Sequence, residues 1–315
     1  MSLTAVARRI AAGALVLWLV SVLAFLMVRL IPGDPARTAA GENATAEQVE
    51  VIRRQLGLDQ PLFTQYGRWL SQVVRGDLGT SLTSTRPVAE SIANAIPPTL
   101  SIALTALLLA IVIGVGAGVV AGLNRGSWLD RAVTAMTTIG IAVPGFWVAM
   151  LLISIFAMKL RLLPATGYTA LSEGFGPWLQ HILLPGSALA LATAAQIARQ
   201  ARGSIADVMA EPYVRTARAR GAWGTLLVRR HVLRNASIPV ITVIGLQAGH
   251  LLGGVIIVEA VAGVSGIGTL ALRAVQDRDY TMIQGYVLLA AVVMVTVNLI
   301  VDLAYQWVNP KVRAS

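Results

Sequence analysis

Residues 99–123 read TLSIALTALLLAIVIGVGAGVVAGL, without a single charged side chain. A helix needs about 20 mostly apolar residues to cross the hydrocarbon core of a bilayer. Only helices and closed barrels satisfy their backbone in lipid, and barrel strands alternate apolar with polar residues. Because this run is apolar throughout, it predicts a membrane-spanning helix.

Working outward from this run, further stretches without Asp, Glu, Lys or Arg are long enough to span. They are Ile10 to Val28, Ala132 to Met158, Gly174 to Ala198, Asn235 to Val258 and Tyr280 to Val301. The first run itself begins at Ser91, and we expect its first residues to be interfacial. Only 13% of the chain is charged, against about 25% in soluble domains. We predict an all-α polytopic membrane protein with six transmembrane helices.

The first stretch could instead belong to a cleaved signal peptide, because Arg8 and Arg9 precede it. Its apolar run is longer than the about 7–15 residues of a signal peptide. The cleavage-like sequence at residues 38–40 also lies well beyond the run. We therefore expect a retained helix.

Basic residues gather in the segments that six spans would place on the side of the N-terminus. They are Arg8, Arg9, Arg125, Arg131, Arg199, Arg202, Arg215, Arg218, Arg220, Arg229, Arg230, Arg234, Lys311 and Arg313. Basic loops stay in the cytoplasm, so we predict that both termini are cytoplasmic. This topology accounts for the net charge of +10, which therefore does not indicate a nucleic acid partner.

The long segment on the outer side should form a small helical cap rather than a separate domain. Thr45 and Gln48 have the spacing of a capping box, and Gly57 ends the helix that follows. Further helices are expected after Pro61 and near Pro87. We divide the chain into residues 1–31 (tail and first span), 32–97 (outer segment) and 98–310 (five-span core).

Motifs for catalysis or metal binding are missing from the sequence. It contains no cysteine, no G-x-x-x-x-G-K-[ST] phosphate loop, no HExxH and no GxSxG. His181, His231 and His250 lie far apart, without metal-ligand spacing. We predict that this chain is not an enzyme and holds no catalytic residue, cofactor or metal.

A proton-driven transporter buries ionisable groups within its spans. Here only Glu259 and Asp302 reach span ends, so we expect a partner protein to supply the energy. A self-sufficient secondary transporter or channel is the alternative from another class.

The cytoplasmic loop of residues 199–235 is a candidate for the surface on which that partner docks. Small residues stand between its arginines: Ala217, Ala219 and Gly221. A membrane anchor would explain the arginines alone. It would not require small residues, which allow close approach to the backbone.

This loop resembles the EAA loop of ABC importer permeases, in the form found in the dipeptide/oligopeptide/nickel permease family. Arg215-Thr216-Ala217-x-x-x-Gly221 aligns with the Glu-Ala-Ala-x-x-x-Gly core of that loop. Arg215 replaces the acidic residue, and Pro239 falls later than the proline of the general pattern. Both departures are typical of the peptide subfamily.

The resemblance covers nearly the whole chain, and the long outer segment resembles that of the first of the two permeases in such systems. The matching motifs are Arg29 to Pro35, Arg54 to Asp59, Gly76 to Ser81, Gly126 to Asp130, Pro144 to Trp147, Leu163 to Tyr168, Gly253 to Glu259, Gly266 to Gly268 and Arg278 to Tyr280.

The resemblance implies the transmembrane domain of a type I ABC importer in the bacterial plasma membrane. Its partners would be a second permease, two cytoplasmic ATPases that bind ATP and Mg, and an extracytoplasmic binding protein. The substrates would be di- and oligopeptides, with nickel chelates or glutathione as alternatives. The residues that couple to the ATPases would be Arg215, Thr216, Ala217, Arg218, Gly221, Ala222 and Trp223.

Two spans carry a glycine at every fourth position, a spacing that lets helices pack closely in lipid. We expect packing within this chain for both; a sliding seam against the second permease is the alternative. The stripes are Gly114, Gly118 and Gly122, and Gly245, Gly249 and Gly253.

Polar residues within spans point to a translocation pathway. Gln247 and His250 are three residues apart, hence on one helix face. Polar side chains are costly in lipid, so they face either a watery path or hydrogen-bond partners on another helix. Pro144, before Gly145, should kink the third span. We take Gln247, His250 and Pro144 as pathway candidates.

Overall fold

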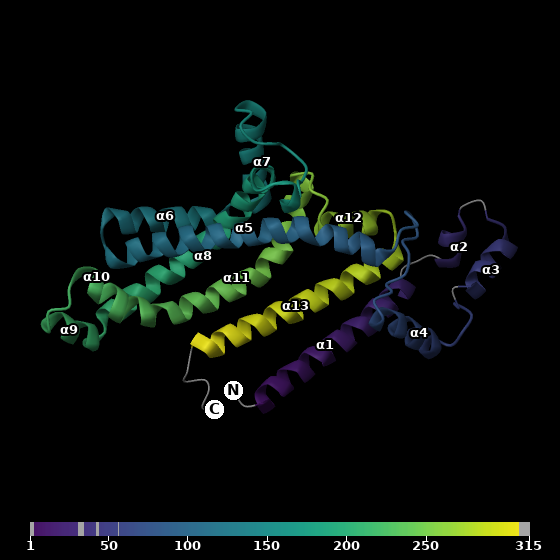
Figure 1. The fold of residues 1–315 in the computed structure, drawn as a ribbon, viewed down its shortest axis with the longest axis horizontal. Helices are drawn as coiled ribbons and strands as arrows, with labels where there is room; N and C mark the ends of the chain where they lie inside the picture. Colours follow the sequence, from purple (N-terminus) through teal and green to yellow (C-terminus); the bar gives the residue numbers. More distant parts are fainter. Residues whose placement is uncertain (1–2, 31–34, 42–43, 56, 309–315) are drawn as a thin grey trace. The chain divides into compact units, whose positions relative to one another are not determined.

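The computed structural model describes residues 3–30, 35–41, 44–55 and 57–308 (Figure 1). Apart from an isolated β-bridge between Thr80 and Pro87, these residues form helices and loops. The helices are α1 (Leu3–Leu30), α2 (Pro35–Ala40), α3 (Ala46–Gln55), α4 (Leu62–Val74), α5 (Val88–Leu123), α6 (Trp128–Ala142), α7 (Gly145–Leu152), the π-helix Ile153–Lys159, the 3-10 turn Leu171–Glu173, α8 (Phe175–Ala210), α9 (Pro212–Ala219), α10 (Gly224–Leu227), the π-helix Val228–Leu233, α11 (Arg234–Val261), α12 (Ile267–Gln276) and α13 (Tyr280–Val308).

The chain forms two compact units, one of residues 1–96 and 269–296 and the other of residues 97–268 and 297–315. Their boundaries fall inside α5, α12 and α13. The two units are groups of residues that contact one another in space. The predicted division into residues 1–31, 32–97 and 98–310 instead describes the expected course of the chain through the membrane. That division stays a prediction.

The predicted spans are confirmed as apolar helices. Within the described residues, five helical segments are long and apolar enough to cross a membrane: Ala7–Met27, Val88–Leu123, Phe175–Ala210, Gly224–Leu251 and Tyr280–Ile300. A sixth arises if the bent pair Trp128–Ala142 and Gly145–Lys159 counts as one span.

The third span is sharply broken, since its two halves differ in direction by 99°. A residue before proline is pushed out of the helical region, and Val143 is accordingly extended, with φ −84° and ψ 126°. Pro144 then caps α7. The predicted kink is confirmed, and it is a complete break between helices.

The fourth span is longer than predicted: α8 continues beyond Ala198 to Ala210. It ends there because Glu211 precedes Pro212 and is extended (ψ 142°), while Pro212 takes the first position of α9.

The outer segment has the predicted capping box. The backbone N–H of Thr45 donates to Gln48 Oε1 (2.9 Å), and that of Gln48 donates to Thr45 Oγ1 (3.3 Å). The helix expected after Pro61 is α4. The helix expected to start near Pro87 is α5, which begins at Val88 and continues through Pro97 and Pro98 into the second span.

A buried carboxylate links two of the sequence motifs. Asp279 is 2% exposed and accepts hydrogen bonds from Ser81 Oγ (2.5 Å), Thr83 Oγ1 (3.1 Å) and the backbone N–H of Leu82 (3.2 Å) and Met282 (3.1 Å). It thereby caps α13 and fixes the turn that precedes α5.

Small residues build the core of the larger unit, where α5, α8 and α11 meet (Figure 1). A Cβ at Gly114 would lie 2.7 Å from the carbonyl oxygen of Ala194, and a Cβ at Gly118 would lie 2.7 Å from that of Ala198. Glycine is therefore required for α5 to approach α8 this closely, which confirms packing within the chain for this stripe. Leu104, Leu108 and Val112 are exposed on α5.

Candidate functional site

A cavity of about 370 Å³ lies in the larger unit, between α7, α8 and α11. Its lining is apolar except for Thr193, Gln196, Gln247 and His250. Two of the three pathway candidates, Gln247 and His250, therefore line one cavity. His250 is exposed.

Gln247 also makes an interhelical contact. It is 8% exposed, and its side-chain Nε2 donates a hydrogen bond to Oε1 of Gln196 on α8. The interhelical hydrogen bond expected as one explanation is therefore present, and the place of Gln247 on a translocation path stays a prediction. The sequence analysis missed Gln196, although an amide within the Ala-rich run of α8 was a signal of the same kind.

Pro144, the third pathway candidate, is outside the lining but next to it. Gly145 and Phe146 of α7 belong to the wall. The break at Pro144 gives α7 a course separate from α6 and lets it form this side of the cavity.

The predicted coupling residues form a short helix and the turn that follows it. α9 carries Arg215 to Arg218, with the fully buried Val214 as its anchor. At the start of α9, the hydroxyl of Tyr213 accepts a hydrogen bond from Asn235 Nδ2 (2.7 Å). Since Asn235 is the second residue of α11, this bond ties the start of α9 to the start of α11.

Gly221 ends α9 in a Schellman motif. Its N–H donates to the carbonyl oxygen of Arg218 (3.0 Å), and the N–H of Ala222 donates to that of Ala217 (3.0 Å). This motif needs a left-handed residue, and Gly221 has φ +88°. No described atom lies within 4 Å of where its Cβ would be. The backbone conformation therefore explains the glycine at this position.

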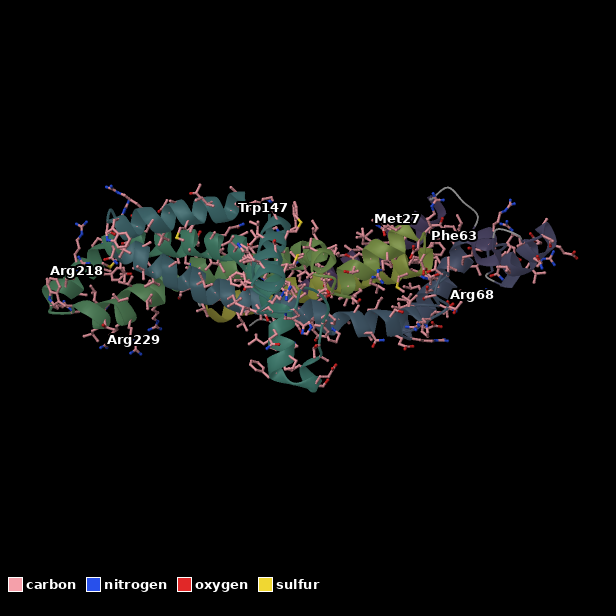
Figure 2. The ribbon with its side chains drawn as sticks, turned by 90° about the horizontal axis from the view of Figure 1, so that it is seen from above. Met27, Phe63, Arg68, Trp147, Arg218 and Arg229 are labelled. Carbon is pink, nitrogen blue, oxygen red and sulfur yellow. The ribbon has the colours of Figure 1, made fainter. Side chains whose placement is uncertain are left out.

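The surface of this segment is open and basic. Arg215, Thr216 and Gly221 are exposed, Ala217, Arg218 and Ala222 are half-buried, and the indole of Trp223 is 69% exposed. Figure 2 shows Arg218 and Arg229 at the same end of this unit. Such a surface offers cationic groups, an aromatic ring and accessible backbone to another protein.

An ion pair that the sequence analysis missed braces this end of α8. Arg202 binds Asp130 with two nitrogens: Nη2 donates to Oδ2 (2.9 Å), and Nε donates to Oδ1. The N–H of Gly126 donates to Oδ2 as well (2.9 Å). Asp130 is 3% exposed. The motif from Gly126 to Asp130 thus fixes the loop between the second and third spans to the helix that leads into α9.

A third buried carboxylate explains two further motifs. Glu259 is fully buried and accepts hydrogen bonds from Thr99 Oγ1 (2.5 Å) and the N–H of Gly268 (2.8 Å). Side chains at Gly266 or Gly268 would collide with Glu259 or Ile256. The glycines are therefore required for the loop to close over the carboxylate.

Among the described residues, none packs against Gly249 or Gly253 of the α11 stripe, which corrects our expectation for these two positions. No described atom lies within 4 Å of a Cβ built on Gly249 or Gly253. Gly249 lies on nearly the opposite side of α11 from Gln247, since successive residues turn by about 100°.

Family models and known relatives agree with the resemblance. Residues 114–314 match the binding-protein-dependent transport system inner membrane component, and residues 2–103 match the N-terminal part of such membrane components. The glutathione transport system permease protein GsiC of Escherichia coli K12 is 44% identical over 297 residues, which cover 94% of each chain. The probable peptide ABC transporter permease protein y4tP of Sinorhizobium fredii is 40% identical over 306 residues, which cover 97% of this chain and 98% of the relative.

Solved structures show the fold. The MetNI methionine ABC transporter in an inward-facing conformation superposes with a TM-score of 0.55 at 18% identity, over 69% of this chain and 96% of the other. An amino acid ABC transporter crystallised with histidines gives 0.54 at 15% identity, over 76% and 97%. The fold is that of the transmembrane domain of a type I ABC importer. With both family models matched in order along its length, the chain belongs to the binding-protein-dependent transport system inner membrane components, the permease subunits of ABC importers.

Proposed function

We propose that this permease imports short peptides as one of two different permease subunits. The observation that carries the proposal is the pair of full-length relatives, one named for glutathione and the other for peptides. Glutathione is itself a short peptide, so both names describe one chemical class, in which a charged amino group and a carboxylate accompany a variable side chain. Because the chain belongs to this family, the alternative of a self-sufficient secondary transporter or channel is excluded.

The cavity chemistry supports this substrate class. Its polar groups are two amides, a hydroxyl and an imidazole (Gln196, Gln247, Thr193 and His250). Such groups can hydrogen-bond a peptide of any side chain without holding it by charge. Among the described residues, no group of three or more His, Asp or Glu side chains could hold a metal ion. A nickel chelate, whose ligand shields the metal, is the remaining alternative.

The energy of ATP hydrolysis would reach the permease through α9. We assign Arg215 to Arg218 and the turn from Gly221 to Trp223 to a cytoplasmic ATPase, which would bind ATP and Mg in place of this chain. The exposed basic surface and the hydrogen bond between Tyr213 and Asn235 support this assignment. Because this bond ties α9 to α11, a movement of α9 would be passed on to that span. The closing of the ATPases would then favour one of two states of the permease pair.

The proposed topology places both termini in the cytoplasm and α3 and α4 outside. A reporter fused near Glu50 should read as external, and a reporter fused after Arg218 should read as cytoplasmic. The reverse pattern would overturn the charge argument.

Deletion of the gene tests the substrate. The mutant should lose uptake of labelled dipeptides and growth on short peptides, and it should gain resistance to toxic peptides. Complementation with the intact gene is the control. If only growth on glutathione as a sulfur source is lost, the narrower glutathione assignment replaces the general one. If peptide uptake persists while nickel-dependent urease activity disappears, the chelate assignment is correct.

A further inference from the structure

The outer helix α4 packs against α1 at two positions of the first span. The hydroxyls of Tyr66 and Ser21 are hydrogen-bonded at 2.8 Å. The ring of Phe25 lies edge-on to that of Tyr66, with centroids 5.3 Å apart, and 5.7 Å from that of Trp69. Ser21 and Phe25 are each 4% exposed, so these contacts form a closed joint.

This joint sets the depth of α4. Ser21 and Phe25 belong to the apolar stretch Ala7–Met27, which is long enough to span the membrane. At 1.5 Å per residue, Ser21 lies about 9 Å below the end of that stretch at Met27. α4 therefore reaches into the thickness that the first span crosses, instead of standing clear of it.

The sides of α4 differ in chemistry. Gln65, Arg68 and Gln72 line a cavity of about 310 Å³ together with Asp77. Phe63 and Val74 lie about 20° apart on the helix at 100° per residue. They are 91% and 79% exposed. The helix thus has one side on α1, one polar side on a cavity and one bare apolar edge.

Lipid fits this edge better than water does. Leu23 of α1 is 64% exposed and Met27 is 39% exposed, as expected of residues that face acyl chains. Figure 2 shows Met27 of α1 in the same region as Phe63 and Arg68 of α4. Because α4 is joined to α1 at the depth of the apolar stretch, its bare edge continues the lipid-facing surface of the span.

We propose that α4 is an interfacial membrane helix, whose edge of Phe63 and Val74 inserts into the leaflet at the Met27 end of α1. That leaflet is the outer one in the proposed topology. Interfacial helices bury their apolar side about 5–10 Å into the boundary between headgroups and acyl chains. The polar side of α4, with Arg68, then faces water and its cavity. The outer segment is thereby fixed to the membrane surface.

Spin labels test the proposal, because the chain has no cysteine and each variant has a single labelling site. Phe63→Cys and Val74→Cys place a nitroxide on the edge, and Gln72→Cys places it on the opposite side of α4 from Phe63. The full chain is reconstituted in vesicles of phosphatidylcholine and phosphatidylglycerol. Collisions with oxygen, which concentrates in lipid, are compared with collisions with a water-soluble nickel complex.

We expect oxygen collisions to exceed nickel collisions several-fold at positions 63 and 74, with the reverse at position 72. The ratio at 63 should correspond to a depth of about 5–10 Å. Equal nickel access at 63 and 72 would show that the edge faces water. Low access to both reagents at 63, in the chain alone or after assembly with the second permease and binding protein, would show that protein covers it. Either result would overturn the proposal.

Discussion

The glycine stripes of α5 and α11 follow the same sequence pattern but lie in different surroundings. On α5, the space where the Cβ atoms of Gly114 and Gly118 would lie is already filled by α8. On α11, the space beside Gly249 and Gly253 is empty of described atoms. The difference teaches that a glycine spacing predicts close approach by some helix, but does not say whether that helix belongs to the same chain. A packed stripe stabilises the subunit, and an open one is available to a partner.

The largest effect should follow from filling the packed stripe. In Gly118→Leu, the side chain would collide with Ala201 and with the carbonyl oxygen of Ala198. Overpacking costs about 1–3 kcal/mol or more, so the melting temperature of the purified chain in detergent should fall. Gly116→Leu is the matched control, since no described atom lies within 4 Å of its Cβ position on the same helix. Equal melting temperatures of the two variants would show that α5 and α8 do not pack as described.

Filling the open stripe should affect assembly instead of folding. In Gly249→Leu, no described residue lies within 4 Å of the new Cβ, so the subunit alone should melt like the unmodified protein. Copurification of the second permease with the tagged variant should fall sharply, because the added bulk would keep the partner helix away. Gly116→Leu again serves as control and should recover the partner in full. Full recovery with Gly249→Leu would assign this face of α11 to lipid.

Gly221, in the cytoplasmic loop, separates the need for space from the need for a backbone conformation. Gly221 has open space beside it and φ +88°. Gly221→Glu should leave membrane insertion intact and uncouple ATP hydrolysis by the assembled complex from peptide uptake, because a charged side chain would block the ATPase. Gly221→Asn is the control, since asparagine tolerates left-handed φ, and it should retain much of the uptake. Unchanged uptake in Gly221→Glu would mean that the loop only anchors the chain.

Sequence patterns predicted the fold well where one property decides the outcome. Spans depend on the length of apolar runs, and the helix after Thr45 depends on a local capping box, so both were found. The break at Pro144 followed from the geometry of proline.

The sequence could not predict features that join distant residues. From the sequence, Asp130 and Arg202 were expected in separate cytoplasmic loops, and nothing local indicated their pairing. Thr99, Glu259 and Gly268 meet only because three elements converge. The pairing of Gln247 with Gln196 depends on the register between α8 and α11, and the open space beside Gly249 depends on where the other described helices pack against α11. Periodicity places a residue on a face, whereas tertiary packing determines what that face meets.

The smallest effect is expected on the opposite face of α11. Gln247→Leu removes the hydrogen bond to Gln196, and the cavity leaves Gln196 access to water, so the loss of stability should be about 1 kcal/mol. Assembly with the second permease should be unchanged, in contrast to Gly249→Leu. Uptake of a labelled dipeptide should fall, because an apolar side chain replaces an amide on the proposed path.

Comparison with Gln196→Leu and the double variant separates the two roles of Gln247. If Gln247 acts only through its bond to Gln196, the double variant should lose no more uptake than either single variant. If both amides contact the substrate, the losses should accumulate. Undiminished uptake in all three variants would reduce the pair to an interhelical hydrogen bond and remove Gln247 from the pathway.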